Sequence, residues 1–235
     1  MFIEIHPEDA RTRRVKTIGI VGGIGPESTI DYYRIFIAAG HTQIIINSVA
    51  VQQLLGMMMK GDTTGVADYL SRAVEQLAEA GADVAIIAAN TPHVAFDEVQ
   101  SRSRIPMVSI VEAVAEHVAA AGMTKVGLLG TRFTMSGRFY PDVFARRGLS
   151  VVPPATADLD YVHASYIGEF LQNQFLPETR DGVLQVIERM QQDLGVQAVI
   201  LGGTELPILL RSDAHHGMPL FDTTKIHAEA VLRAV

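Results

Sequence analysis

The sequence predicts an α/β protein with two pseudo-symmetric, doubly wound parallel-sheet lobes related by internal duplication, and a ligand cleft between them. Short β-branched apolar runs alternate with longer amphipathic segments, which is typical of parallel strands covered on both faces. This pattern restarts near the middle of the chain. Each half also contains an apolar run that ends in a box of small and polar residues, Ala89-Asn90-Thr91 in the first half and Gly203-Thr204-Glu205 in the second.

The first half alternates strand-like and helix-like segments. Val66, Leu70, Val74 and Leu77 recur at the spacing of one helix face, which predicts a helix over 63–80. We expect strands at 17–21, 44–46, 82–88 and 106–110, a further helix at 27–37, and an alanine-rich helix ending at 121.

The second half repeats this order. Residues 125–131 resemble the opening strand and its glycine, and 138–144 parallel the helix at 31–36. The interval from Gly22 to Gly130 nearly equals that from Ala89 to Gly203, which indicates duplication. We therefore expect a first lobe of residues 1–113 plus 214–235 and a second lobe of 114–213. Ligands of such sheets bind beyond the carboxyl ends of the strands.

Composition excludes several classes of protein. A chain of 235 residues with 48% apolar content supports a substantial core, and a net charge of −7 with only a short basic run at 11–16 argues against nucleic-acid binding. The absence of cysteine excludes disulfides, thiolate catalysis and cysteine-bound metal. Acidic residues at 1–8 and the lack of a long apolar run predict neither a signal peptide nor a membrane span, so we expect a cytoplasmic protein.

The glycine-rich loop at 22–25 is a candidate ligand site. It lies between a predicted strand and helix, where small residues let a ligand approach backbone N–H groups and the helix N-terminus favours an anion such as a carboxylate. Gly23 is the expected contact, and the alternative is that these glycines only permit a tight turn. The spacing does not match the dinucleotide fingerprint.

Four segments together resemble the aspartate/glutamate racemase superfamily, most strongly its aspartate racemase and broad-specificity amino-acid racemase branch. The resemblance extends from about residue 17 to the C-terminus. In order, the segments are GGIGPEST at 22–29, NTPH at 90–93, LGGTELP at 201–207 and DTTKIHA at 222–228.

This resemblance implies an enzyme without a cofactor, in which one cysteine opening each box serves as acid or base on either face of the substrate carbon. Those positions match Ala89 and Gly203, whose side chains carry no proton to transfer. Ordinary two-thiol racemisation is therefore impossible in this chain. Three explanations fit the loss of both cysteines. They are natural divergence to other chemistry, natural conversion to ligand binding, and deliberate replacement of the cysteines. We favour natural divergence, because engineering would use one replacement residue at both positions.

The remaining residues of the boxes are candidate ligand contacts. Asn90 and Thr91 present an amide and a hydroxyl to a carboxylate, although Thr91 equally suits a helix cap. Thr204 matches Thr91 in the second lobe, and Glu205 either faces a ligand amine or caps a helix. By the repeat, Thr131 and Thr134 correspond to the first glycine-rich loop, and in related enzymes such hydroxyls help to hold a carboxylate. Turn formation is their alternative role.

Histidines are the other candidates for proton transfer. His93 follows the first box and titrates near neutrality when unperturbed, so it is the nearest replacement acid or base. Related enzymes that use cysteines also carry a histidine there, which favours a structural role. We expect structural roles for His163 and His227, and none for His215 and His216. No histidine spacing predicts a metal site.

The predicted pocket is poor in charge. Where relatives that act on acidic amino acids carry a basic residue after the histidine, this chain has Ala164. A second substrate carboxylate would then lack a partner, so we expect a neutral or less polar ligand. The stretch around Met57 adds apolar surface, which together with the resemblance predicts a homodimer. Pyridoxal phosphate is not expected, because Lys16, Lys60, Lys125 and Lys225 follow no motif for that cofactor.

The leading hypothesis is a racemase-family protein that binds a small amino or organic carboxylate without a cofactor. Any remaining proton transfer would use water, His93 or Glu205. The alternatives are a noncatalytic carboxylate-binding protein, a lyase or hydrolase that uses the same cleft, and a racemase whose cysteines were engineered away.

Overall fold

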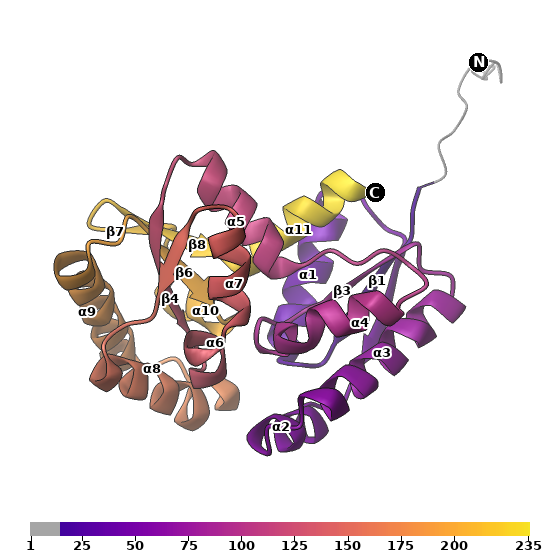
Figure 1. Ribbon diagram of the computed structural model, residues 1–235, viewed down its shortest axis with the longest axis horizontal. Coiled ribbons are helices and arrows are strands. Elements are labelled where there is room, and N and C mark those ends of the chain that lie inside the picture. Colours follow the sequence, from indigo (N-terminus) through magenta and orange to yellow (C-terminus); the bar gives the residue numbers. More distant parts are fainter. Residues whose placement is uncertain (1–14) are drawn as a thin grey trace, which may run out of the picture.

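Two parallel sheets form two lobes that lie side by side (Figure 1). The computed structural model describes residues 15–235. The acidic start at 1–8 and most of the basic run at 11–16 lie outside the described residues. The expectations about a signal peptide and about nucleic-acid binding depend in part on these segments.

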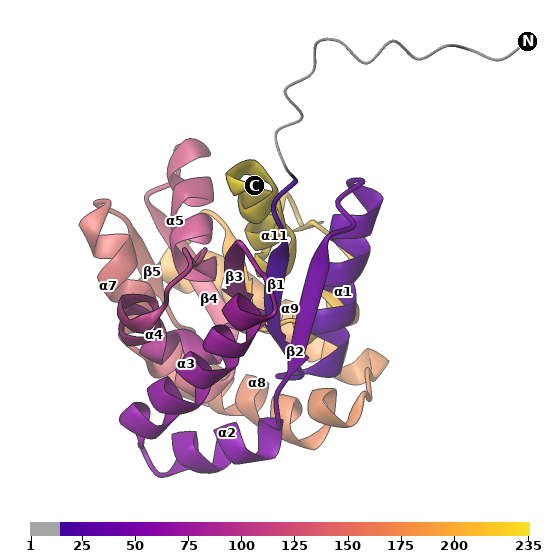
Figure 2. The same cartoon turned by 90° about the vertical axis from the view of Figure 1, so that its right-hand side faces the viewer.

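The first sheet has the strand order β2-β1-β3, with all pairs parallel. Its elements are β1 (Ile18–Gly22), α1 (Pro26–Ala38), β2 (Ile44–Ser48), α2 (Val51–Met59), α3 (Thr63–Glu79) and β3 (Val84–Ile87). The expected helix periodicity is confirmed in α3, whose apolar face is buried and whose N-terminus is capped by Asp62. Central strand β1 is buried along its whole length, because helices cover both faces (Figure 2).

The segment after β3 differs from expectation. A 3₁₀ turn, η1 (Thr91–Ala95), leads into α4 (Phe96–Arg102), and α5 (Ile110–Ala120) follows. The strand expected at 106–110 is reduced to a single bridge between Met107 and Ala85. Ser109 accepts a hydrogen bond from the Glu112 amide and so caps α5, which ends the extended segment one residue earlier than the apolar pattern predicts.

The second sheet has the order β5-β4-β6-β8-β7. Its strands are β4 (Lys125–Gly130), β5 (Ser150–Val152), β6 (Val199–Gly202), β7 (Ala214–His215) and β8 (Met218–Asp222), of which only β7 pairs antiparallel. Its helices are α6 (Arg132–Ser136), α7 (Phe139–Arg146), α8 (Thr156–Gly168), η2 (Phe170–Gln172), α9 (Pro177–Leu194) and α10 (Glu205–Leu210). The carboxyl ends of β3 and β6 carry the two boxes.

The last elements connect the two lobes. From the sequence, residues 214–235 are expected in the first lobe. In the structure, however, β8 pairs with β6, so residues 214–222 belong to the second sheet. The other expected boundary, after residue 113, falls within α5. Helix α11 (Thr223–Ala234) does return to the first lobe, where Ala228 and Val231 pack with Ile18 and Tyr32 (Figure 1).

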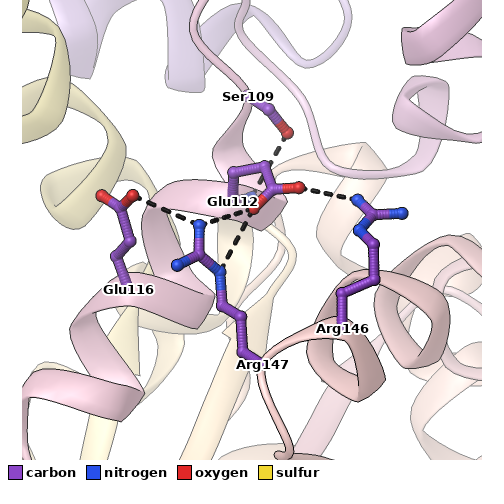
Figure 3. Close-up of polar contacts among 5 residues, drawn as sticks. All are labelled: Ser109, Glu112, Glu116, Arg146 and Arg147. Carbon is purple, nitrogen blue, oxygen red and sulfur yellow. Dashed lines mark hydrogen bonds and ion pairs between the residues drawn. The ribbon is translucent and has the colours of Figure 1, made fainter.

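An ion-pair cluster joins α5 to α7 on the second lobe (Figure 3). Glu112 accepts hydrogen bonds from Arg146 at 2.7 Å and from Arg147 at 2.8 Å, and Arg147 also reaches Glu116. Burial raises the pKa of the Glu112 carboxyl, but the two arginines outweigh this effect and lower it. Because the cluster is half exposed, we expect it to orient the helices more than to stabilise them.

Among residues 15–235, no helix is both long enough and apolar enough to cross a bilayer.

Candidate functional site

The two boxes meet at one cavity of about 90 Å³ between the lobes. Ala89 lies at the end of β3 and Gly203 at the end of β6, and both line this cavity. The shared site is the arrangement that the duplication predicts. The full lining is Ile24, Gly25, Val51, Leu54, Leu55, Met58, Ala89, Asn90, Thr91, Pro92, Thr131, Phe133, His163, Tyr166, Ile167, Leu171, Gly202, Gly203, Thr204 and Glu205.

Asn90 connects the lobes beside the cavity. Its Oδ1 accepts a hydrogen bond from the Tyr140 hydroxyl at 2.6 Å, and its Nδ2 donates to Thr223 Oγ1 at 3.0 Å. Thr223 in turn donates to the carbonyl of Leu201 in β6. Asn90 therefore binds the first box to α7 and α11, and only part of its hydrogen-bonding capacity remains for a ligand.

Three threonine hydroxyls form a second bridge between the lobes. Thr91 Oγ1 lies 3.2 Å from Thr131 Oγ1 and 3.0 Å from Thr134 Oγ1. Thr131 also caps α6 by accepting from the Thr134 amide. Thr91 and Thr131 line the cavity, whereas Thr134 is fully buried behind them. Thr91 and Thr131 therefore face the cavity, whereas Thr134 contacts both hydroxyls from the buried side.

The glycine-rich loop presents Gly25, rather than the expected Gly23, to the cavity. The Gly23 amide already donates to Thr29 Oγ1 at 2.9 Å, and a Cβ there would lie 2.5 Å from Ser48 Oγ. Gly23 is therefore occupied in closing the turn. Gly25 has φ of 89°, and a Cβ on it would lie 3.1 Å from Glu205 Oε1 across the cleft.

Thr204 and Glu205 form the polar part of the second wall. Glu205 begins α10, is 9% exposed, and accepts a hydrogen bond from the Thr204 hydroxyl at 3.1 Å. Burial raises the pKa of the Glu205 carboxyl, against its own backbone amide, the Thr204 hydroxyl and the neighbouring Tyr166 hydroxyl, which lower it. Among residues 15–235, Glu205 is the only acidic side chain in the cavity lining, and no lysine or arginine of this range lines it.

His93 and His227 are engaged away from the cavity. The backbone amide of Ile110 donates to His93 Nε2, so Nδ1 carries the proton and donates to the Ala89 carbonyl at 2.8 Å. Burial lowers the pKa of His93 to about 3, helped by neighbouring His227. His227 accepts from the Tyr32 hydroxyl and donates to the Val108 carbonyl. Both rings hold backbone segments together, and neither lines the cavity.

A wider cavity of about 340 Å³ adjoins the site and shares Met58, Thr91 and Phe133 with it. Arg132 lies on its wall and forms a 2.8 Å ion pair with Asp160. His163 lines the inner cavity while accepting from the Arg132 amide, and burial followed by the Arg132 charge lowers its pKa. Arg132 thus lines the wider cavity and not the inner one.

Tyr166 is the site residue that the sequence analysis missed. It lies in α8, is 1% exposed, and its hydroxyl lies against Gly203, where a Cβ would be only 1.7 Å from Tyr166 Oη. Tyrosine at a buried position of a helix is typical of core packing, so no local pattern distinguishes Tyr166 as a site residue.

One cluster outside the cleft has the composition of a metal site. The side chains of Glu188, His215 and His216 place potential ligand atoms within 4.8 Å of one another. His215 Nε2 lies 2.9 Å from Glu188 Oε1, so an ordinary hydrogen bond accounts for this contact. The sequence predicts no function for the two histidines, and this remains a prediction.

Comparison with known proteins agrees with the geometry. The family model described as Asp/Glu/Hydantoin racemase matches residues 21–231. A Yersinia pestis protein assigned as an Asp/Glu racemase is 32% identical with a TM-score of 0.82, over 93% of this chain and 98% of that one. An aspartate racemase homologue from Pyrococcus horikoshii OT3 is also 32% identical, with the same coverage and a TM-score of 0.76.

Among curated sequences, the glutamate racemase of Corynebacterium glutamicum is 31% identical over 61% of this chain. The match spans only 51% of that enzyme's length. The extended match to the family model and the shared two-lobed fold establish that this chain belongs to the Asp/Glu/hydantoin racemase family.

Proposed function

We propose that the protein binds a small amino or organic acid with a neutral, apolar side chain in the inner cavity, and that it does not perform two-thiol racemisation. One observation carries this proposal. The opposing walls present a methyl group at Ala89 and a hydrogen at Gly203, and within the described part of the chain the only ionic side chains in the lining are Glu205 and, when protonated, His163.

The lining supports the choice of ligand. The Glu205 carboxylate complements an ammonium group, and the Thr91 and Thr131 hydroxyls supply hydrogen-bond donors to a carboxylate. Leu54, Leu55 and Ile167 favour an apolar side chain. Binding aspartate or glutamate would place a second carboxylate beside Glu205 without a lysine or arginine to compensate it.

We distinguish two classes of function within this proposal, and the lyase or hydrolase in the same cleft stays an alternative to both. A racemase-family enzyme with altered proton transfer is the leading candidate, and a noncatalytic binding protein is the second, because His93 has both nitrogens engaged by the backbone. We further propose that the protein acts in the cytoplasm as a homodimer.

A panel of L- and D-amino acids in deuterated water tests the proposal. We expect leucine, methionine or alanine to raise the melting temperature by roughly 5–10 °C at about 100 times Kd, since binding then contributes about 2.7 kcal/mol. Aspartate and glutamate should have little effect. NMR of the α-proton and optical rotation report turnover. Exchange or inversion of the α-carbon would favour the enzyme with altered proton transfer, and melting shifts without exchange would favour the binding protein. Stronger stabilisation by aspartate than by leucine, or no stabilisation by any amino acid, would contradict the proposal.

A further inference from the structure

Gly203 and Tyr166 fit each other closely. Gly203 does not have a positive φ, so its backbone conformation suits any residue. A Cβ at this position would lie 1.7 Å from Tyr166 Oη and 2.5 Å from Cζ, which no side chain can occupy. The space that a residue-203 side chain would need is already filled by the phenol.

The Tyr166 ring has little freedom to withdraw. It is almost completely buried among the apolar residues of the second lobe, including Leu129 and Leu206. It also packs edge to face against Phe170, with ring centroids 5.0 Å apart. Such packing holds the hydroxyl at the cavity wall.

The hydroxyl itself is poorly satisfied. Among residues 15–235 its oxygen is buried and has no hydrogen-bond partner of good geometry, although the Glu205 carboxyl and the Leu206 backbone amide are near enough to shift its pKa. A buried hydroxyl without a partner is costly, and here it borders a cavity that can hold a ligand. Burial, followed by the Glu205 charge, raises the pKa of Tyr166, so the group remains a neutral donor.

We propose that Tyr166 replaces the missing side chain at position 203 and that its hydroxyl donates a hydrogen bond to the carboxylate of the bound ligand. This inference rests on the proposed function. It assigns the two ends of an amino acid to the second wall, with the carboxylate at Tyr166 and the ammonium group at Glu205. It also implies that only glycine fits at position 203 in this chain, which agrees with a natural divergence of the sequence.

Binding measurements on Tyr166→Phe test the contact, because this change removes the hydroxyl and keeps the ring. Tyr161→Phe is the matched control, since Tyr161 lies in the same helix and donates to the Thr179 carbonyl away from the cavity. The probes are L-leucine and isopentylamine, which is leucine without its carboxylate. We expect Tyr166→Phe to weaken leucine binding by on the order of tenfold to a hundredfold and to leave isopentylamine binding unchanged.

The other outcomes each identify a failure. Equal leucine affinity in Tyr166→Phe and the wild type overturns the contact and leaves the proposed function intact. Equal weakening for both probes means that the hydroxyl acts only through Glu205, which also overturns it. If the wild type binds no amino acid of the panel, the proposed function fails and the ligand contact fails with it.

A stability cycle without ligand tests the steric fit independently. We expect Gly203→Ala to lower the melting temperature by roughly 5 °C or more, because overpacking a rigid core is costly. The same change in a Tyr166→Leu background should cost much less, since the phenol is gone. An equal effect in both backgrounds would show that the two residues are not a matched pair. For the same reason, the double substitution Ala89→Cys and Gly203→Cys is expected to give a usable thiol at position 203 only when Tyr166 is also replaced by a smaller residue.

Discussion

Glu205 is a nearly buried carboxyl in the wall of the cleft, where it can face a ligand ammonium group. It is 9% exposed, and its pKa is raised because burial disfavours the carboxylate. A raised folded-state pKa means that the native state binds this proton more tightly than the unfolded chain. The contribution of Glu205 to the free energy of unfolding therefore falls as pH rises from its unfolded pKa through its raised folded one.

Glu205→Gln is expected to separate stability from binding. At neutral pH it should increase the free energy of unfolding by about 1 kcal/mol, because a buried charge is removed. It should also weaken isopentylamine binding by on the order of tenfold, since the ammonium group loses its partner. Urea titration and calorimetry measure the two effects, with Glu178→Gln as control, because Glu178 is an exposed residue in the first turn of α9. Unchanged amine affinity would remove Glu205 from the site.

Helix α11 joins the lobes through a neutral histidine. His227 accepts from Tyr32 in α1 at 2.7 Å and donates to the Val108 carbonyl before α5 at 2.9 Å. Burial lowers the pKa of His227 to about 4 and, with the nearby His227, that of His93 to about 3. When the pH falls, each ring gains a proton on the nitrogen that now accepts a hydrogen bond, and that hydrogen bond is lost.

This arrangement predicts acid sensitivity. Because the folded pKa values are depressed, the stabilisation is complete above about pH 6.5 and is lost as pH falls toward 4 for His227 and 3 for His93. The slope is at most about 1.4 kcal/mol per pH unit for each histidine. Urea denaturation of His227→Gln between pH 4 and 7 should show a lower but flatter stability profile than the wild type. Exposed His216→Gln should retain the wild-type slope, and an unchanged slope in His227→Gln would refute the assignment.

At the scale of the whole molecule, exposed apolar side chains occur on both lobes, and one group of them lies on α1 and β2 of the first lobe. Ile30, Tyr33 and Ile37 project from α1 at helical spacing, and Ile46 is exposed on edge strand β2. The methionine stretch was the expected partner surface, but Met58 lines the cavity and only Met59 is strongly exposed. A homodimer therefore remains a prediction, with the α1 surface as its best location.

Sedimentation velocity tests this prediction. The wild-type protein at tens of micromolar should sediment with twice the mass of the chain. Tyr33→Glu should yield a folded monomer, because a charge on this surface must be desolvated in a dimer. Leu176→Glu, at an exposed apolar site preceding α9, should leave the dimer intact. A monomeric wild type would disprove the dimer, and a dimeric Tyr33→Glu would place the interface elsewhere.

Much of the fold could be predicted from local patterns. Apolar runs ending in Ile87 and Gly202 predicted β3 and β6, and the spacing of Val66 and Leu70 predicted α3, because burial of one face leaves a periodic trace in the sequence. The duplication placed Ala89 opposite Gly203. Ser109, whose capping role ended the predicted fourth strand, shows where local hydrogen bonding overrides an apolar pattern.

The sequence by itself determined the paired boxes, the family resemblance and the absence of any proton-bearing side chain at Ala89 and Gly203. Only the tertiary structure decided that Tyr166 fills the space beside Gly203, that Gly25 rather than Gly23 faces the cavity, and that β8 joins the second sheet. The physical reason is the separation along the chain of the residues that interact. Periodicity and capping are written over a few neighbouring residues, whereas the contact between Tyr166 and Gly203 depends on how α8 packs against β6, which no short segment specifies.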